Sequence, residues 1–124
     1  MRISRKEFED AVERAIELIP EMFRLHLNNM TVAVEDLPSR DLLREMEMPP
    51  GETLFGVFTG VPLPERSVIE PPLYPDVILI FREPLMAACR SFEELEEEIA
   101  VTVVHEVAHY MGMSEEQLEE LGYG

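Results

Sequence analysis

The sequence SFEELEEEIAVTVVHEVAHYMG, residues 91–112, decides the fold because it predicts one long buried helix. Ser91 is the expected N-cap, and Glu94 at the third helical position completes a capping box. Acidic residues fill the first turns, where the helix dipole favours them. The run Val101–Val104 is apolar nearly all round, as a buried central helix requires. Gly112 then provides a helix stop.

The last turns of this helix carry His105-Glu106-Val107-Ala108-His109, which has the form H-E-x-x-H. Residues four apart lie one above the other on a helix face, so both imidazoles can bind a single tetrahedral zinc ion. Glu106 is rotated away from the two histidines by the helix geometry. It therefore stands beside the metal, where it can hold a water molecule and take its proton. We predict His105 and His109 as zinc ligands and Glu106 as the catalytic base.

A third protein ligand is needed, because zinc peptidases use three and leave a fourth position for water. Glu115 follows the motif closely, and a carboxylate oxygen is an acceptable zinc ligand. We predict Glu115 in this role, with Glu116 and Glu119 as alternatives. Ser114 and Gln117 also form a capping-box pattern, which would make Glu115 an ordinary first-turn acid of a following helix.

This pattern resembles the short zincin-like metallopeptidases of bacteria, a family of possible zinc metallopeptidases. The resemblance rests on H-E-x-x-H-x-x-G-x-x-E over residues 105–115 and, more weakly, on residues 54–67. It implies a minimal zincin fold, one Zn²⁺ per chain held by the two histidines and an acid, and Glu106 as base. The longer metzincin pattern matches at the glycine but has a histidine where this chain has Glu115.

Length and composition restrict the other possibilities. We expect a single domain over residues 1–124. The net charge of −16 argues against a nucleic-acid partner, because phosphate binding needs clustered Lys and Arg. One cysteine, Cys89, excludes a disulfide framework and a Cys-rich zinc site. No signal-peptide pattern or membrane-spanning run is visible, so we expect a cytoplasmic protein without a membrane partner.

The acidic residues gather in two segments, Glu93–Glu98 and Glu115–Glu120. Solvated helix faces that aid solubility are the simple interpretation. The alternative is a negative rim around the cleft that favours cationic peptides.

The rest of the chain predicts an α+β domain, with a small mixed sheet packed against an N-terminal helix and the motif helix. A capping box at Ser4 begins the first helix, which ends or kinks at Pro20. Three strands are expected, and the last is apolar enough to be an inner strand. Their ranges are Met30–Leu37, Thr53–Thr59 and Asp76–Phe81. Residues 38–51 should be irregular or briefly helical, and residues 62–75 a long proline-rich loop.

Thr53–Thr59 is the expected edge strand, and peptidases commonly bind an extended substrate at such an edge. Gly56 either permits close approach of the substrate backbone or forms a bulge. His26 is expected to be structural or solvated. Four side chains are candidates for stabilising an oxyanion, and the sequence does not choose among them: Arg66, Tyr74, Tyr110 and Tyr123.

We therefore predict a zinc-dependent peptidase that acts on a peptide or protein. Because only nine residues follow Glu115, the cleft should be shallow, or completed by a second copy or a partner chain. The main alternative is a zinc-binding interaction protein with little turnover, whose metal site is closed to water. A metal-free interaction module is a third possibility.

Overall fold

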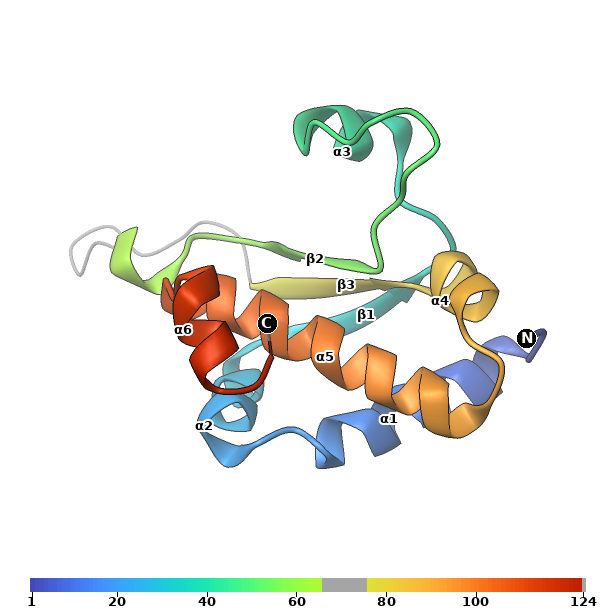
Figure 1. The fold of residues 1–124 in the computed structure, drawn as a ribbon, viewed down its shortest axis with the longest axis horizontal. Helices are drawn as coiled ribbons and strands as arrows, with labels where there is room; N and C mark the ends of the chain where they lie inside the picture. Colours follow the sequence, from blue (N-terminus) through green and yellow to red (C-terminus); the bar gives the residue numbers. More distant parts are fainter. Residues whose placement is uncertain (66–75, 124) are drawn as a thin grey trace.

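The structure is a computed structural model, which describes residues 1–65 and 76–123. It has the predicted α+β architecture, with α5 beneath a small sheet and α1 beside α5 (Figure 1). The helices are α1 (Arg5–Glu17), α2 (Glu21–Arg24), α3 (Arg40–Glu45), α4 (Arg82–Ala88), α5 (Phe92–Met111) and α6 (Glu115–Glu120), with 3₁₀ turns η1 (Leu25–Asn29) and η2 (Leu63–Glu65). The strands are β1 (Thr31–Glu35), β2 (Gly56–Thr59) and β3 (Val77–Phe81).

The sheet is mixed and has the order β1-β3-β2. β1 pairs with β3 in parallel, with Val32 opposite Ile78, and β2 pairs with β3 in antiparallel, with Val57 opposite Leu79. The apolar strand β3 is therefore the inner strand and β2 an edge strand, as predicted. The predicted strand Thr53–Thr59 was too long, because the residues before Phe55 leave the sheet towards α3 (Figure 1).

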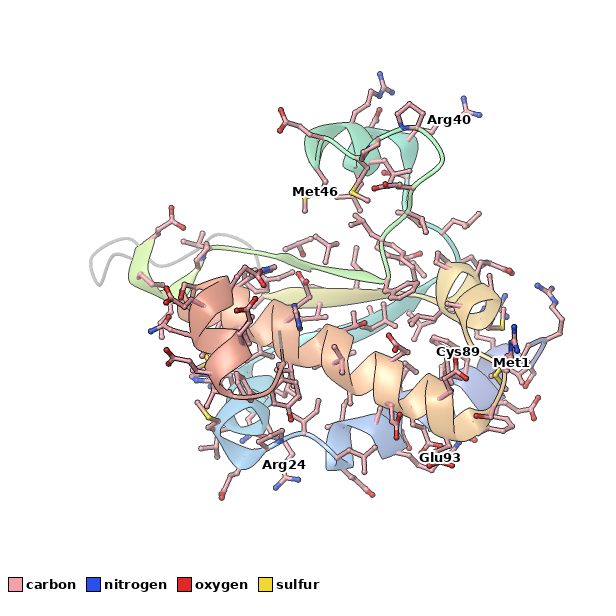
Figure 2. All side chains as sticks on the ribbon, viewed as in Figure 1. Met1, Arg24, Arg40, Met46, Cys89 and Glu93 are labelled. Carbon is pink, nitrogen blue, oxygen red and sulfur yellow. The ribbon has the colours of Figure 1, made fainter. Side chains whose placement is uncertain are left out.

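The first helix forms as its sequence predicts. Ser4 and Glu7 make both bonds of the capping box. Phe8, Ala11 and Ala15 recur at helical spacing and are fully buried, since α1 packs against α5. The amino group of Met1 donates to the carbonyls of Met86 and Cys89, at 2.7 and 3.0 Å, and Figure 2 shows Met1 beside Cys89. These bonds join the start of the chain to the end of α4.

α5 is the central helix of the core. Its residues Leu95, Ile99, Val103 and Val107 are fully buried, while Val101 is 39% exposed. The prediction that Val101–Val104 is buried all round was therefore wrong at Val101, because Val101 lines a surface pocket beside the start of β2. The hydroxyl of Ser91 accepts from the N–H of Glu94, which is one of the two bonds of the predicted capping box.

Two short helices differ in how well the sequence predicts them. α3 is the brief helix expected within residues 38–51, and it stands apart from the body with no buried residue (Figures 1 and 2). α4 was not predicted, and Pro84 lies in its first turn. Proline is tolerated there, since the first turn does not need its N–H. No helix in the described part of the chain is long and apolar enough to cross a membrane.

Candidate metal and catalytic site

The motif occupies the last two turns of α5, where the helix ends and the chain turns back. Gly112 adopts a left-handed conformation (φ 78°) and caps the helix, which L-residues with a Cβ resist. Ser114 then caps α6, with Gln117 completing the predicted capping box. Glu115 lies in the first turn of α6, as the capping pattern required. The sharp turn at Gly112 thus brings Glu115 back to the motif.

Glu106 is fixed against the edge of the sheet. Its carboxylate oxygen Oε1 accepts a hydrogen bond of 2.7 Å from the backbone N–H of Phe58, in β2. The side chain of Glu106 is only 12% exposed. In an antiparallel pair, alternate residues direct their N–H and C=O groups away from the partner strand. Since this N–H of Phe58 bonds to Glu106, the carboxylate lies at the open side of β2.

Gly56 explains how α5 approaches β2 so closely. A Cβ atom at this position would lie 2.7 Å from Cγ2 of Thr102 and 2.8 Å from the carbonyl oxygen of Leu79. The close approach therefore comes from α5 and β3. The bulge expected at Gly56 is absent, because the position pairs regularly with Ile80, and the approach of a substrate backbone stays a prediction.

His109 lies between two carboxylates. Its Nδ1 is 3.4 Å from Oε1 of Glu106, and its Nε2 is 3.8 Å from Oε1 of Glu115. A hydrogen bond to Glu106 is the largest cause that raises the pKa of His109 above its ordinary value of 6.5. Partial burial opposes this shift, and the charge of Glu115 adds to it. The imidazole of His109 is about half exposed.

His105 has a different partner. Its Nε2 lies 2.5 Å from the backbone carbonyl oxygen of Tyr123. The ring of Tyr123 packs edge-on against Phe23, with centroids 5.9 Å apart. The segment after α6 therefore folds back across His105 and is anchored on α2.

The donor chemistry of these residues fits zinc, which favours imidazole nitrogen and carboxylate oxygen. His105 and His109 are one helical turn apart, and Glu115 lies beside His109. Within residues 1–65 and 76–123, however, no three His, Cys, Asp or Glu side chains lie close enough to hold one metal ion. The Nε2 of His105 faces the carbonyl of Tyr123. Binding of a metal ion through this nitrogen therefore requires the Tyr123 segment to release His105.

The other candidates lie elsewhere. The ring of Tyr110 is buried, with its centroid 5.5 Å from the rings of His26 and Phe58, and its role at an oxyanion stays a prediction. His26 is accordingly a partly buried structural residue, as expected. Arg66 and Tyr74 lie outside the described residues. Cys89 is buried, and burial raises the pKa of its thiol, as expected of an apolar core residue.

Sequence reasoning missed two backbone groups of the site: the N–H of Phe58 and the carbonyl of Tyr123. A side-chain pattern cannot reveal them, because every residue carries the same backbone donor and acceptor. The usable signal was Gly56. A glycine inside a strand pattern indicates that another backbone or helix approaches closely.

Comparisons with known proteins address the fold and the family of the chain. A conserved hypothetical protein from T. thermophilus has a similar structure, with a TM-score of 0.55 and 22% sequence identity. The match covers 96% of this chain and 97% of that one, and at this identity it shows the fold alone. No curated protein matches the chain. The family model of the zincin-like metallopeptidases matches residues 27–124, which include all three strands and the complete motif. The chain belongs to the family of zincin-like metallopeptidases.

Proposed function

We propose that this chain is a zinc-dependent peptidase in which His105, His109 and Glu115 hold the metal and Glu106 is the general base. The observation that carries the proposal is the position of Glu106. Its carboxylate is held between His109 and the N–H of Phe58, where the motif helix meets the edge of the sheet. Membership of the zincin-like family supports the same assignment.

Zinc, when bound, supplies a Lewis acid that activates water and polarises the carbonyl to be attacked. Glu106 accepts the proton of the attacking water and later gives it to the leaving amine. Its hydrogen bond to Phe58 fixes one carboxylate oxygen and leaves the second for the proton. Because Glu106 is largely buried, few competing waters reach it, which strengthens its interaction with a charged partner.

The substrate would lie in extended form along the open side of β2. One feature restricts this arrangement: the N–H of Phe58 is already used by Glu106. The substrate backbone would therefore pair with β2 on either side of this position, which places the bond to be cut next to Glu106. We also propose that a second copy or a partner chain completes the cleft beyond α6, where Glu115 and His109 are exposed.

The change Glu106→Gln tests this assignment, because it keeps the shape and one oxygen of the side chain but removes the base. We expect about one zinc ion per chain in both proteins, and hydrolysis reduced by roughly 10²–10⁴-fold in the variant. Glu120→Gln is the matched control, since it removes an exposed acid of α6 that is neither the base nor a candidate ligand. Equal hydrolysis by wild type and Glu106→Gln would contradict the mechanism.

The second candidate is a zinc-binding interaction protein with little turnover. The contact between His105 and the carbonyl of Tyr123 favours low turnover, because the segment that carries Tyr123 restricts the access of a substrate to the motif. The same experiment separates the two functions. An interaction protein binds zinc in both forms, and neither form cleaves peptides.

A further inference from the structure

A pocket of about 240 Å³ lies between the start of β2 and the face of α5 that precedes the motif. His105 and Glu106 form one end of it, and Phe55, Glu98 and Val101 line the rest. We propose that this pocket receives a lysine or arginine side chain of the substrate, next to the bond to be cut. This inference rests on the proposed function, since the substrate must lie along β2 for its side chain to enter.

The size of the pocket suits one side chain. Sites for whole small molecules begin at about 300 Å³, so this pocket is too small for a separate ligand of that kind.

The pocket residues on α5 recur at positions three and four apart, from Glu98 through Thr102 to Glu106. They therefore form one continuous stripe of the helix. A side chain entering beside Glu106 would extend along this stripe towards Glu98.

The chemistry of the lining favours a long cationic side chain. Phe55 and Val101 offer apolar walls for the methylene groups of lysine or arginine. Glu98 is partly buried, and its carboxylate belongs to the part of the pocket lining that lies along α5 away from Glu106. The hydroxyl of Thr102 donates to the backbone carbonyl of Glu98, at 2.8 Å. It therefore does not donate to the carboxylate of Glu98.

The carboxylate of Glu98 has no ion pair or hydrogen bond with any residue that the structure describes. Glu96, two residues earlier, shows the usual arrangement, because it pairs with Arg14 at 3.1 Å. A partly buried acid without a cation is costly, and a cation supplied by a ligand relieves that cost. The net charge of −16 also draws cationic peptides towards the molecule.

Peptides that differ only in lysine against norleucine test this proposal, because norleucine keeps the apolar stem and removes the charge. We expect kcat/KM to favour lysine roughly ten- to hundredfold at one position beside the cleaved bond. Glu98→Gln should abolish that preference. Glu97→Gln, which removes the neighbouring exposed acid, should keep it. The same lysine preference in Glu98→Gln as in wild type would overturn the proposal.

A binding measurement keeps this test independent of catalysis. Fluorescein-labelled versions of the same peptides are titrated with zinc-loaded Glu106→Gln, with and without Glu98→Gln, and anisotropy gives Kd. Tighter binding of the lysine peptide that depends on Glu98 supports the pocket even if the wild type cleaves nothing, an outcome in which only the proposed function fails. Equal Kd values for the two peptides would overturn the pocket assignment even if hydrolysis is observed.

Discussion

The two sides of the motif are built differently. On the sheet side, Glu106 bonds to the backbone of β2, and Gly56 lets α5 pack directly on the strand. On the C-terminal side, Glu115 comes from a six-residue helix, is well exposed, and lies 3.8 Å from His109. The difference indicates that the proposed base is held rigidly by the core of the fold. The proposed third ligand stands on a short helix that is fixed by its capping box and by the buried Leu118, but its own side chain is exposed.

The largest effect is expected on the sheet side, from Gly56→Ala. The new methyl group would lie within 3 Å of Thr102 and of the Leu79 carbonyl, so α5 must move away from β2. We expect unfolding free energy to fall by about 1–3 kcal/mol. Thermal or urea unfolding measures this, with Thr53→Ala as an exposed control on the same segment, expected to change stability by less than about 0.5 kcal/mol. Equal stability of the two variants would show that α5 and β2 are not closely packed.

On the C-terminal side, Glu115→Ala should weaken zinc binding without affecting the fold. Loss of a ligand should cost at least about tenfold in affinity, since even outer partners of metal ligands contribute that much. Competition with a chromophoric chelator measures the affinity. Glu116→Ala and Glu119→Ala are matched controls from the same helix. A larger loss in either control than in Glu115→Ala would assign the third ligand to that residue.

We also expect the carboxylates of Glu106 and Glu115 to contribute unequally to the raised pKa of His109. Because Glu106 is the larger cause, Glu106→Gln should lower the pKa of His109 more than Glu115→Gln does. NMR titration of the imidazole in the metal-free protein measures both values. Zinc needs the neutral ring, so its affinity should rise as the pH increases through the raised pKa of His109. Interaction with Glu106 stabilises the metal-free fold below pH 6.5, and this contribution is lost above the raised pKa. A larger decrease of the His109 pKa in Glu115→Gln than in Glu106→Gln would show that Glu115, on the C-terminal side, is the stronger partner of His109.

The smallest effect is expected from Tyr123→Ala, which removes the ring contact with Phe23 and loosens the segment over His105. The metal-free protein should lose about 0.5–1.5 kcal/mol of stability, the usual contribution of an aromatic pair. Zinc affinity should stay the same or increase, because His105 is released more easily. Chemical denaturation and chelator competition measure the two quantities. A fall in zinc affinity would mean that Tyr123 supports the metal site instead of covering His105.

Most of the fold could be predicted from local patterns. Ser4, Ser91 and Ser114 mark helix starts because a hydroxyl replaces a missing backbone partner wherever a helix begins. The apolar strand β3 is central, with Ile78 and Ile80 fully buried in the core. α4 was not predicted. Proline disrupts the interior of a helix but is tolerated in the first turn, where Pro84 lies.

The site could be predicted only in part. Helix geometry alone puts His105 and His109 on one face and Glu106 beside it. The positions of Phe58 and Tyr123 depend on the pairing of β2 and on the turn after α6, so they follow from tertiary packing. The exposure of Val101 also follows from tertiary packing, because it depends on which side of α5 the other elements cover.

Zinc binding at the motif is tested most directly by the zinc content of purified wild type, Glu106→Gln and His109→Ala, measured by elemental analysis after reconstitution. We expect one zinc ion per chain in the first two proteins and a loss of stoichiometric zinc in His109→Ala, because Glu106 is the proposed base and His109 a proposed ligand. Stoichiometric zinc that survives His109→Ala would place the metal elsewhere, and the absence of zinc from all three proteins would contradict zinc binding at the motif.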